Sequence, residues 1–127
     1  MATLTALRGE FGICRHGSSA EIPAWAKESG FFSITRTPEE LSVVCSAACI
    51  PRKVRAERGW RCLKVEGPLD FGETGVVLSL AEPLARAGVS IFVVSTYETD
   101  YLLVRGRDLK AAVKVLRLAG HKVDIES

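Results

Sequence analysis

The sequence predicts an α+β protein made of two tandem ferredoxin-like βαββαβ units, the first of them abbreviated. Residues 32–44, FSITRTPEELSVV, align without a gap on residues 92–104, FVVSTYETDYLLV, at a spacing of 60 residues. In each copy, an apolar run that begins with Phe is followed by a polar tetrapeptide and a second apolar run, which is typical of a β-hairpin. A period this long indicates two copies of one supersecondary unit.

The second copy, residues 60–127, shows the elements most clearly. Its expected elements are a strand (60–67), a loop (68–75), a helix ending at Gly88, hairpin strands (89–95 and 101–106), a helix closed by Gly120 and a last strand (121–126). This order predicts two helices on one face of a four-stranded antiparallel sheet. Pro83 lies inside the first helical stripe, so we expect a kink or a break there.

The first copy, residues 1–59, is shorter. Its expected elements are a first strand within 4–16, a short helix within 21–30, a hairpin ending at Cys45 and about one helical turn at 46–51, which Pro51 limits. A unit this short cannot bury a core alone. We therefore expect the two units, 1–59 and 60–127, to pack as one.

Composition excludes several classes of function. The 127 residues are 47% hydrophobic and 25% charged, and 17 basic against 15 acidic side chains leave a formal net charge of only +2. This balance gives no overall field for nucleic acid or membranes. The N-terminus lacks the features of a signal peptide, and no segment approaches the roughly 20 apolar residues of a membrane span, so a cytoplasmic protein is expected.

Catalytic and metal sites are not expected either. The sequence has no P-loop, no G-x-G-x-x-G and no H-E-x-x-H motif, and His16 and His121 are its two histidines. Each of the four cysteines sits among apolar residues without zinc-ligand spacing, which predicts reduced, buried or half-buried thiols without a metal. No cofactor is expected. The cysteines are Cys14, Cys45, Cys49 and Cys62.

Two segments carry a more specific signal. The hairpin VSIFVVSTYETDYLLV (89–104) and the loop and helix DFGETGVVLSLAEPLARAG (70–88) resemble the tandem ACT-domain proteins, which include the regulatory domains of aspartate kinase and the cytosolic arginine sensor of animals. The resemblance covers about residues 4–126 and is strongest over 60–126. It implies a regulatory module that binds a small molecule, usually an amino acid, at the interface between two domains. The ligand contacts that it implies are Glu73 and Gly75 in the loop, Thr96, Tyr97 and Asp100 in the hairpin turn, and Ser42 and Val43 in the first copy.

These residue types suit a free amino acid chemically. A turn at Gly75 that opens a helix offers unpaired N–H groups to a carboxylate. Glu73 and Asp100 offer anions to an ammonium or guanidinium group, so a cationic amino acid is favoured. Thr96 can donate or accept a hydrogen bond, as can Ser42.

Each residue also has a purely structural interpretation. Gly75 can serve a tight turn, Glu73 can be a first-turn acid favoured by the helix dipole, and Asp100 can set turn geometry. Tyr97 can be exposed packing.

The two copies differ in their polar residues. Arg36, Thr37 and Glu40 stand where the second copy has Thr96, Tyr97 and Asp100, which favours one specialised site at the seam between the copies. The predicted function is an amino acid sensor that acts through a homo-oligomer or a protein partner. The alternative is a protein-interaction adaptor that binds a partner through its sheet edges and has no small ligand. An enzyme is a third, less favoured alternative.

Overall fold

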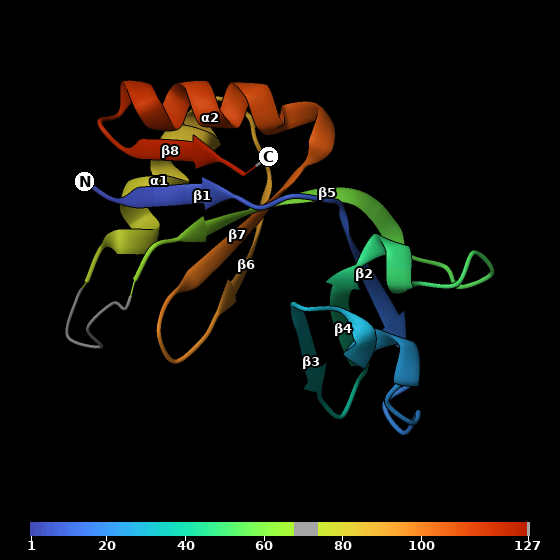
Figure 1. Ribbon diagram of the computed structural model, residues 1–127. Coiled ribbons are helices and arrows are strands. Elements are labelled where there is room, and N and C mark those ends of the chain that lie inside the picture. The colour runs from blue at the N-terminus through green and yellow to red at the C-terminus, as the bar shows by residue number, and fades with distance from the viewer. Residues whose placement is uncertain (68–73, 127) are drawn as a thin grey trace. The chain divides into compact units, whose positions relative to one another are not determined.

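The computed structural model describes residues 1–67 and 74–126, which form two compact units (Figure 1). The first unit is Gly9–Trp60, and the second unit combines Met1–Arg8 with Arg61–Ser127. Along the chain, the first unit is therefore inserted into the second. The sequence predicted a division between residues 59 and 60, so the difference concerns the first eight residues and Trp60.

The second unit has the predicted βαββαβ order and one additional strand. Its described elements are β1 (Thr3–Ala6), the end of β5 (Glu57–Val65), α1 (Val76–Arg86), β6 (Ile91–Ser95), β7 (Asp100–Arg105), the 3₁₀ turn η3 (Gly106–Asp108), α2 (Leu109–Leu118) and β8 (Lys122–Ile125). The strands are arranged in the order β6-β7-β5-β1-β8. β1 is antiparallel to β5 and parallel to β8, so the described sheet is mixed rather than antiparallel throughout.

The position of β1 corrects the expected assignment of residues 4–16 to one strand of the first copy. Leu4 pairs with Val65 and Ala6 with Leu63, and all four side chains are fully buried. Between β1 and β2 the backbone turns at Gly9, which has a positive φ of 88°. Two strands therefore come from this segment, because its first apolar residues complete the core of the second unit.

The core of the second unit lies between one face of the sheet and both helices. Strand residues two apart along the chain, such as Leu102 and Val104 of β7, share a face and are fully buried. Leu80 and Leu84 of α1 pack in the same cluster, as do Ala112, Val113 and Leu116 of α2. The two helices therefore cover one face, as the sequence predicted.

Pro83 does not break α1, which continues to Arg86. A proline removes the N–H that would bond to the carbonyl four residues earlier, here that of Ser79. His121 supplies another partner, because its Nε2 lies 3.2 Å from the Ser79 oxygen. Of the expected kink or break, the break is absent, and the Ser79 carbonyl finds a partner in another element.

The first unit is an abbreviated version of the same plan. Its elements are β2 (Phe11–His16), the 3₁₀ helix η1 (Ala24–Glu28), β3 (Phe32–Arg36), β4 (Leu41–Ser46), the short 3₁₀ turn η2 (Ala47–Cys49) and the beginning of β5. β4 lies between β3 and β2, and Phe11 of β2 pairs with Trp60 of β5. All these pairs are antiparallel, and single 3₁₀ turns replace the helices of the second unit.

The two hairpins correspond at a spacing of 59 residues rather than 60. In the first unit, Thr37 N donates to the carbonyl of Glu40 at 2.8 Å. In the second, Thr96 N donates to the carbonyl of Thr99, also at 2.8 Å. Thr37 is therefore the counterpart of Thr96, and the expected match of Thr37 to Tyr97 is wrong.

The strand pairs agree with this register. Arg36 pairs with Leu41 where Ser95 pairs with Asp100. Asp100 thus corresponds to Leu41, which is fully buried, and not to Glu40 as the sequence match predicted. The physical reason is that the turn threonine fixes the register, whereas apolar runs can be aligned one residue out of step.

Candidate ligand site

The β6–β7 turn is built around two threonines. The hydroxyl of Thr96 donates to the carbonyl of Thr99 at 3.1 Å and accepts from its N–H at 3.3 Å. Thr99 is only 5% exposed, and its own hydroxyl donates to the carbonyl of Val65 in β5 at 2.6 Å. Thr99 therefore ties the turn to the sheet. Sequence analysis missed this residue, although the T-x-x-T spacing of a threonine-capped turn was visible.

Asp100 begins β7 at the end of this turn. Its Oδ1 accepts a hydrogen bond of 2.6 Å from the hydroxyl of Ser95, the residue opposite on β6. The side chain is half-buried, and no hydrogen bond or ion pair found among the described residues engages Oδ2. A carboxylate that is held by a hydrogen bond at one of its two oxygens therefore occupies the position where the first unit has the core residue Leu41.

A small polar pocket lies beside the turn. It has a volume of about 220 Å³ and is lined by Lys64, Glu66, Gly67, Thr96, Tyr97, Glu98, Thr99 and Tyr101. Glu66 is held in place, since one oxygen accepts from the Thr5 hydroxyl at 2.6 Å and the other lies 3.8 Å from Lys64 Nζ. Drug-sized ligands occupy pockets of roughly 300–1,000 Å³. A pocket of this size therefore suits a smaller, polar molecule.

The predicted site residues of the second unit fall in different places. Thr96 and Tyr97 line the turn pocket, and Tyr97 is 80% exposed. Asp100 borders this turn without lining the pocket. Gly75 lines a different pocket, and Glu73 lies outside the described residues.

Gly75 serves a backbone role in the structure. It is the N-cap residue of α1 and has a φ of 79°, a left-handed conformation that favours glycine. Gly75 is exposed, and the N–H of Ser79 donates to the Gly75 carbonyl at 2.9 Å. The tight-turn interpretation of Gly75 therefore applies, whether or not a ligand also contacts it.

The predicted residues of the first unit lie on β4. Ser42 is half-buried and pairs with Arg15 on β2 and Thr35 on β3. Val43 is fully buried in the core of its unit, so its side chain is not available to a ligand in this structure.

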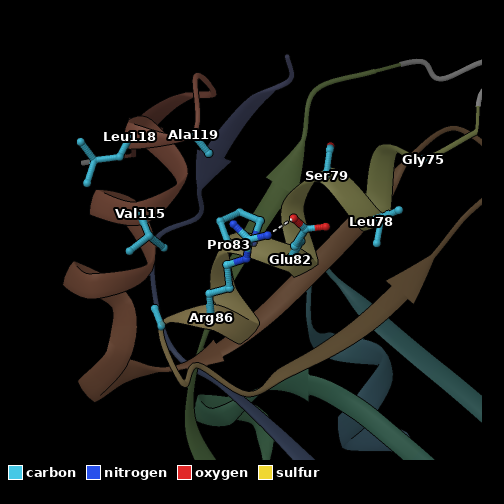
Figure 2. Close-up of a pocket in the computed structure, with 10 residues that line it drawn as sticks. Gly75, Leu78, Ser79, Glu82, Pro83, Arg86, Val115, Leu118 and Ala119 are labelled. Atoms are coloured by element: carbon cyan, nitrogen blue, oxygen red, sulfur yellow. Dashed lines mark ion pairs between the residues drawn. The ribbon is translucent and has the colours of Figure 1, made fainter.

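The second pocket lies between α1 and α2 (Figure 2) and has a volume of about 640 Å³. Leu78, Glu82 and Arg86 line it from α1, and Val115 and Leu118 from α2. Glu82 and Arg86 neutralise each other in an ion pair of 2.8 Å. Among the described residues, the lining of this pocket is thus largely apolar, and its two charged side chains pair with each other.

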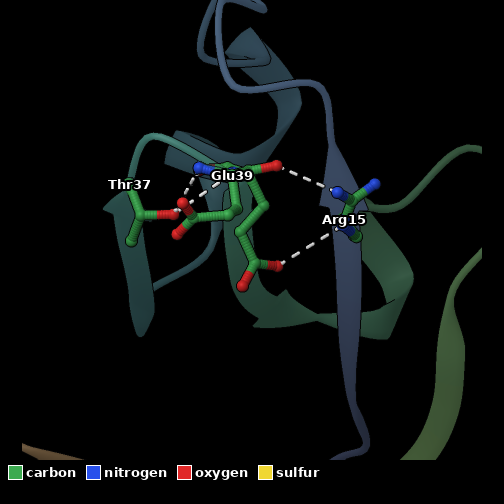
Figure 3. A network of polar contacts seen from close by, with 4 residues as sticks. Arg15, Thr37 and Glu39 are labelled. Carbon is green, nitrogen blue, oxygen red and sulfur yellow. Dashed lines mark hydrogen bonds and ion pairs between the residues drawn. The ribbon is translucent and has the colours of Figure 1, made fainter.

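In the first unit, the side chain of Arg15 contacts the β3–β4 turn, which corresponds to the β6–β7 turn (Figure 3). Arg15 Nη2 donates to the carbonyl of Glu39 at 2.9 Å, and Arg15 Nε lies 3.7 Å from Glu40 Oε1. The Thr37 hydroxyl accepts from the N–H groups of both glutamates at 3.2 Å. A guanidinium group of the chain itself therefore contacts this turn.

All four cysteines are free, and three have clearly shifted acidity. Burial raises the pKa of Cys62 to about 12. Burial also raises the pKa of Cys45 to about 11, and the neighbouring thiols of Cys14 and Cys49 contribute to the rise at Cys45. Burial also raises the pKa of Cys14, against an opposing effect of Arg58. These thiols stay protonated at neutral pH and are poor nucleophiles.

Residues 1–67 and 74–126 contain no group of three or more His, Cys, Asp or Glu side chains that could hold a metal ion. In the same part of the chain, no helix is long and apolar enough to cross a membrane.

Comparison with known proteins identifies the family. A family model described as an ACT domain matches residues 55–117, and a model for an N-terminal domain matches residues 9–53. The chain belongs to the ACT-domain family. The ferredoxin-like α+β fold predicted from the sequence is confirmed. The two matched ranges meet inside the segment that precedes β5, close to the division between the structural units.

Relatives of this ACT-domain chain include proteins with and without a named function. Subunit 1 of the cytosolic arginine sensor for mTORC1 from Bos taurus is 34% identical over 97 residues, which are 68% of this chain and 30% of that protein. The chain thus spans about a third of the length of that curated relative. A crystal structure of a protein from Agrobacterium tumefaciens is 49% identical, covers 99% of this chain and 94% of its own, and has a TM-score of 0.93.

A more distant similarity supports the fold alone. Aspartate kinase from Clostridium acetobutylicum has a TM-score of 0.65 at 13% identity, over 88% of this chain and 33% of the enzyme. That aspartate kinase is an allosteric enzyme.

Proposed function

We propose that this ACT-domain chain binds a free amino acid and passes the binding signal to a second copy or to another protein. The observation that carries the proposal is the β6–β7 turn, where Asp100 presents a half-engaged carboxylate beside a small polar pocket. Support comes from the arginine sensor, whose name describes amino acid sensing and which is 34% identical over the matched region. No catalytic step is part of the proposal.

A cationic amino acid fits the turn best. Asp100 Oδ2 is open to an ammonium or guanidinium group, and charge-assisted hydrogen bonds to such groups are worth about 1.5–3 kcal/mol each. Arg15 gives an internal precedent, since its guanidinium contacts the corresponding turn of the first unit through a carbonyl and a carboxylate. Thr96 and Tyr97 then contribute polar and aromatic walls, and the N–H groups near Gly75 are proposed for the ligand carboxylate.

The placement of the ligand between the two units stays part of the proposal. Ser42, Val43 and Glu73 are its remaining contacts, with Val43 limited to its backbone. Ser42→Ala tests the contribution of the first unit, and Ser33→Ala is a matched control, because Ser33 is a half-buried serine on the neighbouring strand β3. Weaker binding in Ser42→Ala but not in Ser33→Ala supports the placement, and equal binding in both places the ligand elsewhere.

The direct test is a thermal-shift screen of the full chain with each of the twenty free amino acids. At about 100 times the dissociation constant, a ligand stabilises the folded state by about 2.7 kcal/mol. We expect arginine or lysine to raise the melting temperature, and aspartate and glutamate not to do so. If no amino acid stabilises the chain, the adaptor alternative replaces this proposal.

A further inference from the structure

The outer side of α2 carries a groove that the proposed amino acid site does not use. Leu109, Val113 and Leu118 of α2 and Ile125 of β8 form its apolar lining, and its volume is about 460 Å³. The α2 residues span nearly three helical turns, so the groove is about 14 Å long at a rise of about 1.5 Å per residue. Its floor is therefore an apolar strip along a helix.

This strip continues into the pocket between α1 and α2. Leu118 lines both, and Leu78 extends the apolar surface onto α1 (Figure 2). Leu78, Leu118 and Ile125 are 64%, 77% and 59% exposed. Exposed large aliphatic side chains that gather around one surface, rather than being scattered singly, mark an interaction site.

The groove is also positively charged. Lys110, Lys114 and Arg117 line it, and none of the described residues that line it is acidic. Arg117 donates a 2.6 Å hydrogen bond to the carbonyl of Val123, and no ion pair among the described residues engages its guanidinium group. Within the described residues, no carboxylate lies within 4 Å of the Lys110 or Lys114 ammonium groups, so three cations border the apolar strip without partners of opposite charge.

We propose that this groove binds an acidic amphipathic helix of a partner protein. An elongated apolar groove suits the helix-in-groove mode, in which apolar anchors repeat along one face of the bound helix. The cations select acidic residues at the edge of that face, because complementary charge favours one partner over another. The proposal concerns a surface separate from the amino acid site and does not depend on it.

The test uses two synthetic peptides of about four helical turns with the same leucine pattern. One carries Glu and the other Lys at the polar positions, and fluorescence anisotropy measures their binding to the full chain. We expect the acidic peptide to bind, with an affinity that falls as salt screens the charges. Equal binding of both peptides, or no binding of either, overturns the proposal.

Variants on the exposed surface locate the site. We expect Leu118→Asp, and separately Lys110→Glu combined with Lys114→Glu, to weaken acidic-peptide binding by about tenfold or more. There are two matched controls. Ile22→Asp is the control for Leu118→Asp, and the double variant Lys27→Glu with Lys53→Glu is the control for the lysine pair. All three residues are exposed and lie in the first unit. Unchanged binding in Leu118→Asp contradicts the proposed site.

A second copy of the chain is the competing occupant. Sedimentation measurements on the wild type and Leu118→Asp distinguish it. If the wild type is a dimer that Leu118→Asp converts to a monomer, the groove is a self-interface and the proposal is wrong. An unchanged oligomeric state, together with loss of peptide binding, supports it.

Discussion

His121 replaces the hydrogen-bond donor that Pro83 removes from α1. Its Nε2 lies 3.2 Å from the carbonyl oxygen of Ser79, and its Nδ1 accepts from Ala2 N at 3.0 Å. Since Nδ1 accepts, the ring proton is on Nε2, which donates to Ser79. The histidine is 7% exposed, and its ring connects the residue before β1 with α1.

His121→Ala should lower the free energy of unfolding by about 1–3 kcal/mol, because two part-buried backbone groups lose their partner. In a Pro83→Ala background, residue 83 regains an N–H that can bond to Ser79. We therefore expect the cost of His121→Ala to be about 1 kcal/mol smaller there, as measured by urea unfolding in a double-mutant cycle. Equal costs in both backgrounds would show that His121 does not compensate for Pro83.

Thr99→Val should destabilise the protein by about 1 kcal/mol. The substitution removes the hydroxyl that bonds to the Val65 carbonyl and leaves that oxygen without this partner. Thr99→Ser retains the hydroxyl and is the matched control, with a smaller expected loss. If both variants unfold at the same urea concentration, the hydrogen bond between β5 and the β6–β7 turn contributes little.

Asp100→Ala should weaken binding of the stabilising amino acid by about tenfold to over a hundredfold, as the loss of one charge-assisted hydrogen bond implies. The unliganded fold should change by no more than about 1 kcal/mol, because Asp100 accepts a single part-exposed bond from Ser95. Calorimetric titration measures the affinity. Asp124→Ala, which removes an exposed carboxylate from β8, is the control and should bind as the wild type does.

If Asp100→Ala binds as tightly as the wild type, Asp100 is a turn residue and the ligand lies elsewhere.

Stability should fall with rising pH above about 9 because of Cys62. The folded-state pKa of about 12 exceeds the ordinary thiol value of 9.0, so above pH 9 the unfolded chain binds fewer protons than the folded chain. The free energy of unfolding then decreases as pH rises, by up to about 1.4 kcal/mol per pH unit for one thiol. Below pH 9 this contribution is fully present.

Urea unfolding of the wild type and Cys62→Ala between pH 8 and about 11 measures this effect. Other groups titrate in both proteins, so the difference in slope isolates Cys62. We expect the free energy of unfolding to decline less steeply with pH in Cys62→Ala than in the wild type. Parallel declines would mean that the thiol is not protected by burial.

The sequence alone determined the class of the fold and most of its elements. Hairpin patterns at residues 32–44 and 92–104 and the helical stripes of α1 and α2 depend on local periodicity, which the chain order shows directly. The resemblance of TYETD and DFGETG to ACT domains is also a property of the sequence, and it implies Asp100, Thr96 and Tyr97 as ligand contacts. These are properties of residues close together in the chain.

The tertiary structure decided everything that joins distant residues. It placed β1 between β5 and β8, because Leu4 and Ala6 needed a core that lies about sixty residues away in the chain. It set the repeat at 59 residues, since hydrogen bonds of Thr37 and Thr96 fix each turn where apolar runs alone allow a one-residue slip. It also gave His121 a partner in Ser79, a contact that local pattern cannot reveal because it depends on how α1 and the chain before β8 pack.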